Sequence, residues 1–143
     1  MDGYRHTLAI PVRFADLDVL GHLNNAVYLT YLEQARIQYV QEVCGWSGDW
    51  TKLGMILAKM VIDFKLPVVY GDAVVVYTRC SRIGGKSFDL EYAMTRSQAN
   101  GSPDTAAAAT SVMVAYDYIR QTAIPVLETW RQAIAAYEPA FPK

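Results

Sequence analysis

Two aspartates spaced by one residue, Asp16 and Asp18, precede an Asn-Asn pair at positions 24 and 25. The Asn-Asn pair is a typical start signal for the helical pattern that follows it. The first amide groups of a helix have no partner inside the helix, and the helix dipole favours negative charge at that end. Such amides can hold the oxyanion that develops when an acyl carbonyl is attacked, while a nearby carboxylate attacks or activates water. These residue types in this order therefore indicate acyl chemistry.

The two aspartates have different expected roles. Asp18 is nearer the helix start, in a loop that Gly21 can bend tightly, and is the first candidate for a catalytic carboxylate. The alternative is that Asp18 binds loop amides, although the helix cap itself is expected in the Asn-Asn pair. Asp16 is expected to bind neighbouring backbone or Arg13, and a proton shared between the two acids is the alternative.

Two further polar residues lie close to this loop in the sequence. His22 could orient the loop or act as an acid-base group, and a metal site is not expected because His6 is the only other histidine. Glu33 lies eight residues after Asn25, which is about 12 Å along a helix axis. One reacting group cannot easily contact both positions. We therefore expect Glu33 to pair with Arg36 or to lie in a subunit interface.

Hydrophobic periodicity predicts the elements that must position these residues. They are a strand at 7–14, a helix at 26–43, strands at 55–65, 73–83, 87–96 and 106–118, and a short helix at 126–137. The alanine run at 106–109 is assigned to a strand because β-rich residues follow it and a loop of hairpin length precedes it. The long helix has a wide apolar arc. We therefore predict an α+β fold in which a curved antiparallel sheet of about five strands wraps around one central helix.

The composition fits one globular domain over residues 1–143, with 52% hydrophobic and 19% charged residues. The formal net charge of -1 leaves no basic field, which argues against general affinity for nucleic acid. No apolar stretch approaches the roughly 20 residues of a membrane-spanning helix. Cys44 and Cys80 fit neither a metal site nor a disulfide framework, so we expect packed thiols in a reducing cytoplasm.

A denser pattern extends from the first aspartate into the helix. The order strand, Asp-x-Asp, Gly-His-x-Asn-Asn-x-x-Tyr and Glu-x-Ala-Arg resembles the 4-hydroxybenzoyl-CoA thioesterase family of the hotdog fold. The positions that carry the resemblance are Asp16, Asp18, Gly21, His22, Asn24, Asn25, Tyr28, Glu33, Ala35 and Arg36. The resemblance implies an enzyme that hydrolyses acyl-CoA or acyl carrier protein thioesters without a metal or redox cofactor. It also implies a homodimer or homotetramer with the site between subunits.

The resemblance also implies roles for individual residues. Asp18 would be the nucleophile or the general base for water, and the backbone N–H of Asn25 would polarise the thioester carbonyl. Gly21 and Tyr28 are assigned to substrate binding, with a core position as the alternative for Tyr28. The strand at 55–65 and the turn at 84–87 are expected near the ligand tunnel. Side chains there that could meet substrate phosphates or the substrate itself are Lys59, Lys65, Arg82, Lys86 and Ser87.

Two other functions stay open at this point. A hotdog hydratase or dehydratase for acyl thioesters would need a well-placed histidine with an acid, and His22 matches that requirement poorly. An acyl-CoA-binding module would keep the fold without turnover. The preferred prediction is an acyl-CoA thioesterase that releases a free acid and a thiol. The sequence does not define its acyl group.

Overall fold

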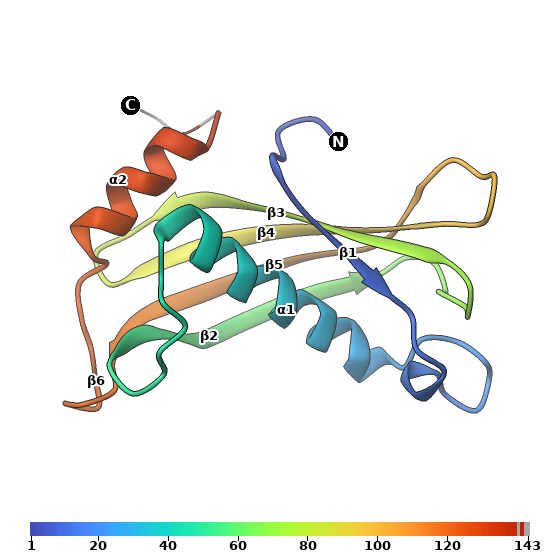
Figure 1. Cartoon of the computed structure of the whole chain (residues 1–143), viewed down its shortest axis with the longest axis horizontal. Helices are drawn as coiled ribbons and strands as arrows, with labels where there is room; N and C mark the ends of the chain where they lie inside the picture. The colour runs from blue at the N-terminus through green and yellow to red at the C-terminus, as the bar shows by residue number, and fades with distance from the viewer. Residues whose placement is uncertain (140, 142–143) are drawn as a thin grey trace.

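The computed structural model describes residues 1–139 and 141. The chain starts with a strand and a 3-10 turn, continues through the long helix, and then supplies the remaining strands (Figure 1). The elements are β1 (His6–Pro11), η1 (Phe14–Asp16), α1 (Asn25–Cys44), β2 (Leu53–Phe64), β3 (Ala73–Ile83), β4 (Ser87–Ser97), β5 (Asp104–Asp117), β6 (Thr122–Ala123) and α2 (Glu128–Tyr137).

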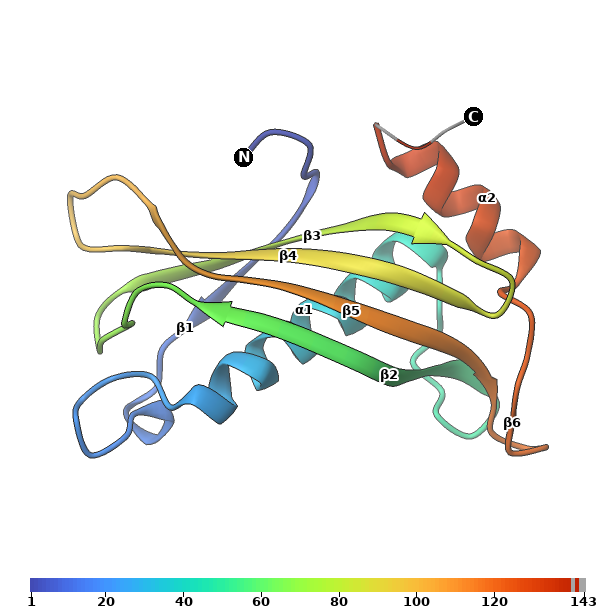
Figure 2. The ribbon, with the colours of Figure 1, turned by 180° about the vertical axis from the view of Figure 1, so that it is seen from behind.

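The strands form one antiparallel sheet in the order β1-β3-β4-β5-β2, and the short β6 pairs with the end of β5. α1 lies across one face of the sheet, and Figure 2 shows the strands in front of this helix from the other side. α2 packs near the β3–β4 turn, where the ring of Trp130 lies 6.2 Å from that of Phe88. The predicted fold class, α+β with a curved antiparallel sheet around one long helix, is confirmed.

β2 does not pair with β3, the strand that follows it in the chain. β2 lies at the sheet edge and pairs with β5, while β3 lies between β1 and β4. The connection from β2 to β3 therefore crosses the end of the sheet. On this path Lys65 donates its N–H to the carbonyl of Ala106, and the carbonyl of Val68 accepts from the N–H of Leu23. The crossing segment thus contacts the loop that precedes α1.

The alanine run at 106–109 lies within β5, as predicted. Ladder pairing with β2 on one side and β4 on the other holds this segment extended. Ala106, Ala107 and Ala109 are buried there. Tertiary pairing and burial therefore outweigh the helix preference of alanine at these positions.

α1 turns one face to the sheet and leaves the other to solvent. Its buried residues are Tyr28, Tyr31, Leu32, Ala35, Arg36, Tyr39 and Val40. Leu29, Thr30, Glu33 and Gln34 are exposed. Within one chain the sheet therefore covers one side of the helix, and its enclosure is less complete than the wide apolar arc predicts. The helix ends at Gly45, whose φ of 69° is the left-handed conformation that glycine adopts readily.

Candidate active site

The start of α1 lies beside the loop that follows β1. Asn24 caps the helix, since its side-chain Oδ1 accepts a hydrogen bond of 2.9 Å from the N–H of Ala26. The N–H of Asn25 has no acceptor among residues 1–139 and 141. The predicted cap in the Asn-Asn pair is confirmed, and it leaves one free amide donor at the helix start.

Asp18 lies at a tight turn in the loop between η1 and α1. The N–H of Gly21 donates to the carbonyl of Asp18 at 3.0 Å, and the φ of Gly21 is +77°, so this glycine supplies the bend that the sequence predicts. Oδ1 of Asp18 accepts hydrogen bonds from the N–H groups of Leu20 and His22 at 2.8 and 3.2 Å. Oδ2 has no hydrogen-bond partner in the described part of the chain. The carboxylate is therefore held through one oxygen and available through the other.

A cavity of about 370 Å³, the Asp18 cavity, joins this loop to the helix start. Five of its lining residues are among those predicted from sequence, namely Asp18, His22, Asn25, Tyr28 and Lys65. The opposite wall is formed by the end of β2 and the segment that follows it, namely Phe64, Lys65, Leu66 and Pro67. The family resemblance places the strand at 55–65, with Lys65, near the ligand. The sequence does not reveal that Leu66 and Pro67 line the same cavity, because only the sheet crossing brings them to the start of α1. Lys65 is the basic side chain of the lining.

Tyr28 and His22 contribute to the cavity in different ways. Tyr28 is only 3% exposed, and its hydroxyl donates to the carbonyl of Leu66 at 3.2 Å. It is therefore a core residue, as the alternative interpretation predicts, that also lines the cavity. The carbonyl of His22 accepts from the N–H of Asp18 at 2.7 Å, and His22 forms an isolated bridge with Val69. These contacts give the backbone of His22 a part in orienting the loop.

The residues predicted around the β3–β4 turn lie at the other end of the sheet. β3 begins at Ala73, paired with Pro11 near the Asp18 loop, and its far end carries Arg82. Roughly ten residues of strand separate these ends by about 33 Å. The guanidinium of Arg82 forms an ion pair of 2.9 Å with Asp89. Within one chain the structure does not bring three predicted substrate-binding residues to the Asp18 cavity: Arg82, Lys86 and Ser87.

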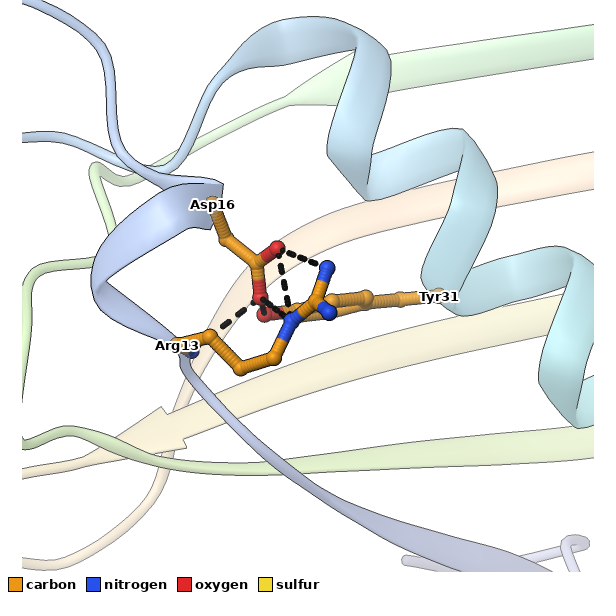
Figure 3. A network of polar contacts seen from close by, with 3 residues as sticks. All are labelled: Arg13, Asp16 and Tyr31. Atoms are coloured by element: carbon orange, nitrogen blue, oxygen red, sulfur yellow. Dashed lines mark hydrogen bonds and ion pairs between the residues drawn. The ribbon is translucent and has the colours of Figure 1, made fainter.

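Asp16 is buried at the centre of a polar network at the end of β1 (Figure 3). Its Oδ1 accepts from Nη2 of Arg13 at 2.8 Å, and its Oδ2 accepts from the hydroxyl of Tyr31 at 2.7 Å. Hydrogen bonds from Arg13, supported by Tyr31, lower the pKa of Asp16 to about 2. Burial and the hydrogen bond to Asp16 raise the pKa of Tyr31. The predicted contact with Arg13 is confirmed, and the described residues show no hydrogen bond between the side chains of Asp16 and Asp18.

A second cavity of about 260 Å³, the Trp50 cavity, lies between the middle of α1 and the beginning of β2. Arg36, which lines it, is buried and forms the predicted ion pair with exposed Glu33 at 3.3 Å. The rest of the lining is mainly apolar and includes Ile37, Trp50, Met55, Leu57 and Met113. The two cavities thus lie at opposite ends of β2.

The remaining titratable candidates give no metal or thiol centre. No cluster of three or more His, Cys, Asp and Glu side chains suited to a metal ion occurs in residues 1–139 and 141. Burial raises the pKa of both Cys44 and Cys80 to about 12, so these thiols are protonated at neutral pH. Among the helices described here, none combines the length and apolar character needed to cross a membrane.

The sequence matches the Thioesterase-like superfamily over residues 12–134. This match covers most of the chain, including the Asp18 loop, the whole of α1 and the sheet from β2 to β6. The chain therefore belongs to the Thioesterase-like superfamily.

Individual relatives agree with this assignment. A thioesterase from Thermus thermophilus, solved with coenzyme A and Zn, is 36% identical with a TM-score of 0.79, over 95% of this chain and 96% of that one. A 4-hydroxybenzoyl-CoA thioesterase variant in complex with 4-hydroxybenzoyl-CoA has the same fold, with a TM-score of 0.81, 20% identity, and coverage of 90% and 96%. The long-chain acyl-CoA thioesterase FadM of Escherichia coli K12 is 30% identical over 89 residues, which is 60% of this chain.

The curated relatives are matched over only part of their length. The matched segment spans 66% of FadM and 56% of YsmA from Bacillus subtilis. The superfamily and the fold are therefore established, whereas the activity of this chain is inferred from its own site.

Proposed function

We propose that this chain hydrolyses an acyl-CoA thioester to a free acid and a thiol. The observation that carries the proposal is that one cavity is lined by both Asp18, whose Oδ2 is unpaired among the described residues, and Asn25, whose N–H is free there. Membership of the Thioesterase-like superfamily supports the same reaction. The Asn25 amide would donate to the thioester oxygen, with the positive end of the α1 dipole behind it.

Asp18 can act by either of two routes. As a nucleophile, its Oδ2 attacks the thioester carbon, the C–S bond breaks, and water then hydrolyses the mixed anhydride. As a general base, it takes a proton from the water molecule that attacks the carbon, and the thiolate leaves with a proton from solvent. Neither route needs a redox step, because the carbon keeps its oxidation state.

Replacement of the carboxylate tests the proposal directly. We expect Asp18→Asn to lower the rate of thiol release by at least about 100-fold, since positioned acid-base groups contribute 10²- to 10⁴-fold. The matched control is Asp104→Asn, an exposed aspartate in the β4–β5 hairpin, which should retain the parental rate. A panel of acyl-CoA and acyl carrier protein thioesters, followed by thiol detection, would also define the acyl group. Equal, negligible rates in the parent and in Asp18→Asn would overturn the proposal and leave an acyl-CoA-binding module as the better account.

The two routes differ in where the oxygen of water first appears. In a single turnover in water labelled with heavy oxygen, the nucleophilic route places label in the carboxylate of Asp18 when water attacks the aspartyl carbon of the anhydride, whereas the general-base route never places label there. Mass spectrometry of the peptide that contains Asp18 distinguishes these results. Hydration of an enoyl-CoA without thiol release would instead support the hydratase alternative.

We also propose that the active form is at least a homodimer joined through β2. This strand is one edge of the sheet, is 12 residues long, and carries exposed apolar side chains, including Ile56, Leu57, Val61 and Phe64. A long apolar edge is a template for pairing with another strand. A two-fold axis through β2 would pair the strand with its copy in antiparallel fashion.

Such pairing would place the beginning of one β2 beside the end of the other. The Trp50 cavity of one subunit would then adjoin the Asp18 cavity of its partner. The Asp18 cavity would hold the thioester carbonyl and the Trp50 cavity would hold the acyl group.

The two unpaired thiols, Cys44 and Cys80, fit the reducing cytoplasm that we propose as the compartment.

A further inference from the structure

The Asp18 loop has a stem that begins at Asp16. The carbonyl of Asp16 accepts from the N–H of Asn24 at 2.9 Å, and the N–H of Asp18 donates to the carbonyl of His22 at 2.7 Å. Between these two bonds, Leu17 forms a bridge with Leu23. The loop is therefore a short antiparallel stem, with Asp16 and the helix cap at its base and Asp18 at its tip.

The side chain of Asp16 fixes the base of this stem to the surrounding elements. Arg13 binds the carboxylate through its backbone N–H, Nε and Nη2, at distances from 2.8 to 3.3 Å. Tyr31, which projects from α1, donates its hydroxyl to the same carboxylate (Figure 3). Asp16 and Tyr31 are each 2% exposed, so their contact is made inside the protein, whereas the Arg13 side chain, 75% exposed, covers the carboxylate from the surface. One carboxylate thus joins the end of β1, the stem and the helix.

Asp16 does not itself face the proposed reaction. It lines a separate cavity with Pro11, Tyr31 and Gln34, and it is absent from the lining of the Asp18 cavity. Both of its oxygens are already engaged by Arg13 and Tyr31. Its contribution to chemistry would therefore pass through the stem.

We propose that Asp16 is a positioning residue that holds the Asp18 carboxylate in register with the free N–H of Asn25. The expected effect on the rate rests on the proposed thioesterase function. The expected effect on the position of Asp18 rests only on the contacts of the stem. The stem is anchored at Asp16, whose carbonyl accepts from the N–H of Asn24, and α1 begins at the next residue, Asn25. A shift of the anchor would change the separation between Asp18 and the Asn25 amide, and misplacement by about 1 Å can reduce a rate 100-fold.

The kinetic test compares Asp16→Asn in the parent and in Asp18→Asn. In the parent we expect kcat to fall by about 10- to 100-fold with KM within about twofold, because substrate binding elsewhere is unchanged. In the Asp18→Asn background the same substitution should have no further effect on the residual rate. A merely structural role would lower the rate by the same factor in both backgrounds, through loss of folded protein, and that result would overturn the proposal.

A second measurement reports positioning without using activity. The N–H groups of Leu20 and His22 donate to Oδ1 of Asp18, so their hydrogen exchange, followed by NMR, reports the position of that carboxylate. In Asp16→Asn we expect these two amides to exchange about tenfold faster, while amides in the middle of β3 and β4 exchange as in the parent. Unchanged exchange at both amides would contradict the inference even if the parent protein released no thiol. The proposed function and the positioning role therefore fail by different results.

Two further variants keep the test interpretable. Tyr31→Phe removes one donor and leaves the Arg13 contacts, so it should change kcat and exchange in the same direction but less, and it serves if Asp16→Asn does not fold. Glu91→Gln is the matched control, since it removes a carboxylate from another arginine pair, with Arg79 at 2.6 Å, away from the loop. Glu91→Gln should leave kcat and the two loop amides unchanged. An effect of Glu91→Gln as large as that of Asp16→Asn would overturn the positioning role.

Discussion

Among the residues that the structure describes, the carboxylate of Asp16 accepts hydrogen bonds on both oxygens, whereas that of Asp18 accepts them on Oδ1 alone. Asp16 is buried against an arginine and a tyrosine, and Asp18 belongs to a cavity with a free helix amide. Two identical side chains, two positions apart, are therefore suited to different tasks by their partners. Asp16 has the contacts of an anchor and Asp18 has the free oxygen that a nucleophile or base requires.

The anchoring role of Asp16 has a consequence for stability against pH. Its pKa in the folded protein is about 2, below the ordinary value of 3.8. A carboxyl whose pKa is lowered by folding stabilises the protein above the unfolded-state pKa, and that stabilisation is lost as the pH falls through the folded-state pKa. We therefore expect the parent to exceed Asp16→Asn in free energy of unfolding at pH 7, and the difference to shrink between about pH 4 and pH 2.

Urea unfolding of both proteins at a series of pH values measures this difference. The protein concentration must be kept constant, because association also contributes to apparent stability. A difference that stays constant from pH 7 to the acid limit would contradict the ionised, hydrogen-bonded state of Asp16.

At the scale of the elements, local signals predict most of the secondary structure but not the order of the sheet. The helix at 26–43 follows from three- and four-residue spacing, and its cap follows from the Asn-Asn pair. The pairing of β2 with β5 does not follow, because the two strands are separated by β3 and β4 in the chain. Only contacts distant in sequence decide that β2 lies at an edge.

The same physical limit applies to the site. Asp18, His22, Asn25 and Tyr28 are close in sequence, and the loop and first helical turns bring them to one cavity. The resemblance predicts that the strand at 55–65 lies near the ligand, and Lys65 lines the cavity. Leu66 and Pro67 reach it only through the sheet crossing. β3 runs away from the Asp18 cavity, so Arg82 at its far end is distant from that cavity within one chain. The sequence does not give the pairing register of the strands, so it does not predict this separation.

The exposed edge of β2 gives a prediction for assembly. Ala58 lies at the β-bulge between Leu57 and Lys59, where it has no partner in β5. Proline there removes an N–H and fixes the backbone φ while leaving the β2–β5 ladder in place, as bulges tolerate proline. We expect Ala58→Pro to be monomeric and inactive, whereas the parent is at least a dimer, as measured by light scattering coupled to size exclusion.

The control for this prediction is a second change at the same exposed position, Ala58→Ser. Serine keeps the backbone N–H that proline removes, so this variant should assemble and turn over substrate as the parent does. A parent that is monomeric at working concentration, or an Ala58→Pro variant that stays dimeric, would show that β2 is not the interface.

For the whole molecule, the two cavities have complementary character. The Asp18 cavity supplies a carboxylate and an amide donor, and the Trp50 cavity supplies an apolar lining beside the Glu33–Arg36 pair. They lie at opposite ends of β2. A two-fold axis through that strand would therefore place the Asp18 cavity of each subunit beside the Trp50 cavity of its partner. The exposed side of α1 would then face the partner, which accounts for the incomplete enclosure of the helix within one chain.

This arrangement predicts complementation between two defective subunits. Asp18→Asn removes the carboxylate, and Ile37→Trp fills the Trp50 cavity from a half-buried position on α1. Each homodimer should be inactive toward thioesters with a large acyl group. A heterodimer of one Asp18→Asn subunit and one Ile37→Trp subunit, isolated with two affinity tags, has one intact composite site. It should therefore show about half of the parental activity per dimer.

The matched heterodimer carries both substitutions in one subunit and none in the other. If the carbonyl and the acyl group occupy cavities of different subunits, this dimer has no intact site and should be inactive. If both groups bind within one chain, the results are exchanged: the matched heterodimer keeps about half of the activity and the complementing one has none. Because the two heterodimers contain the same substitutions in the same number, any difference between them arises only from which subunit supplies each cavity.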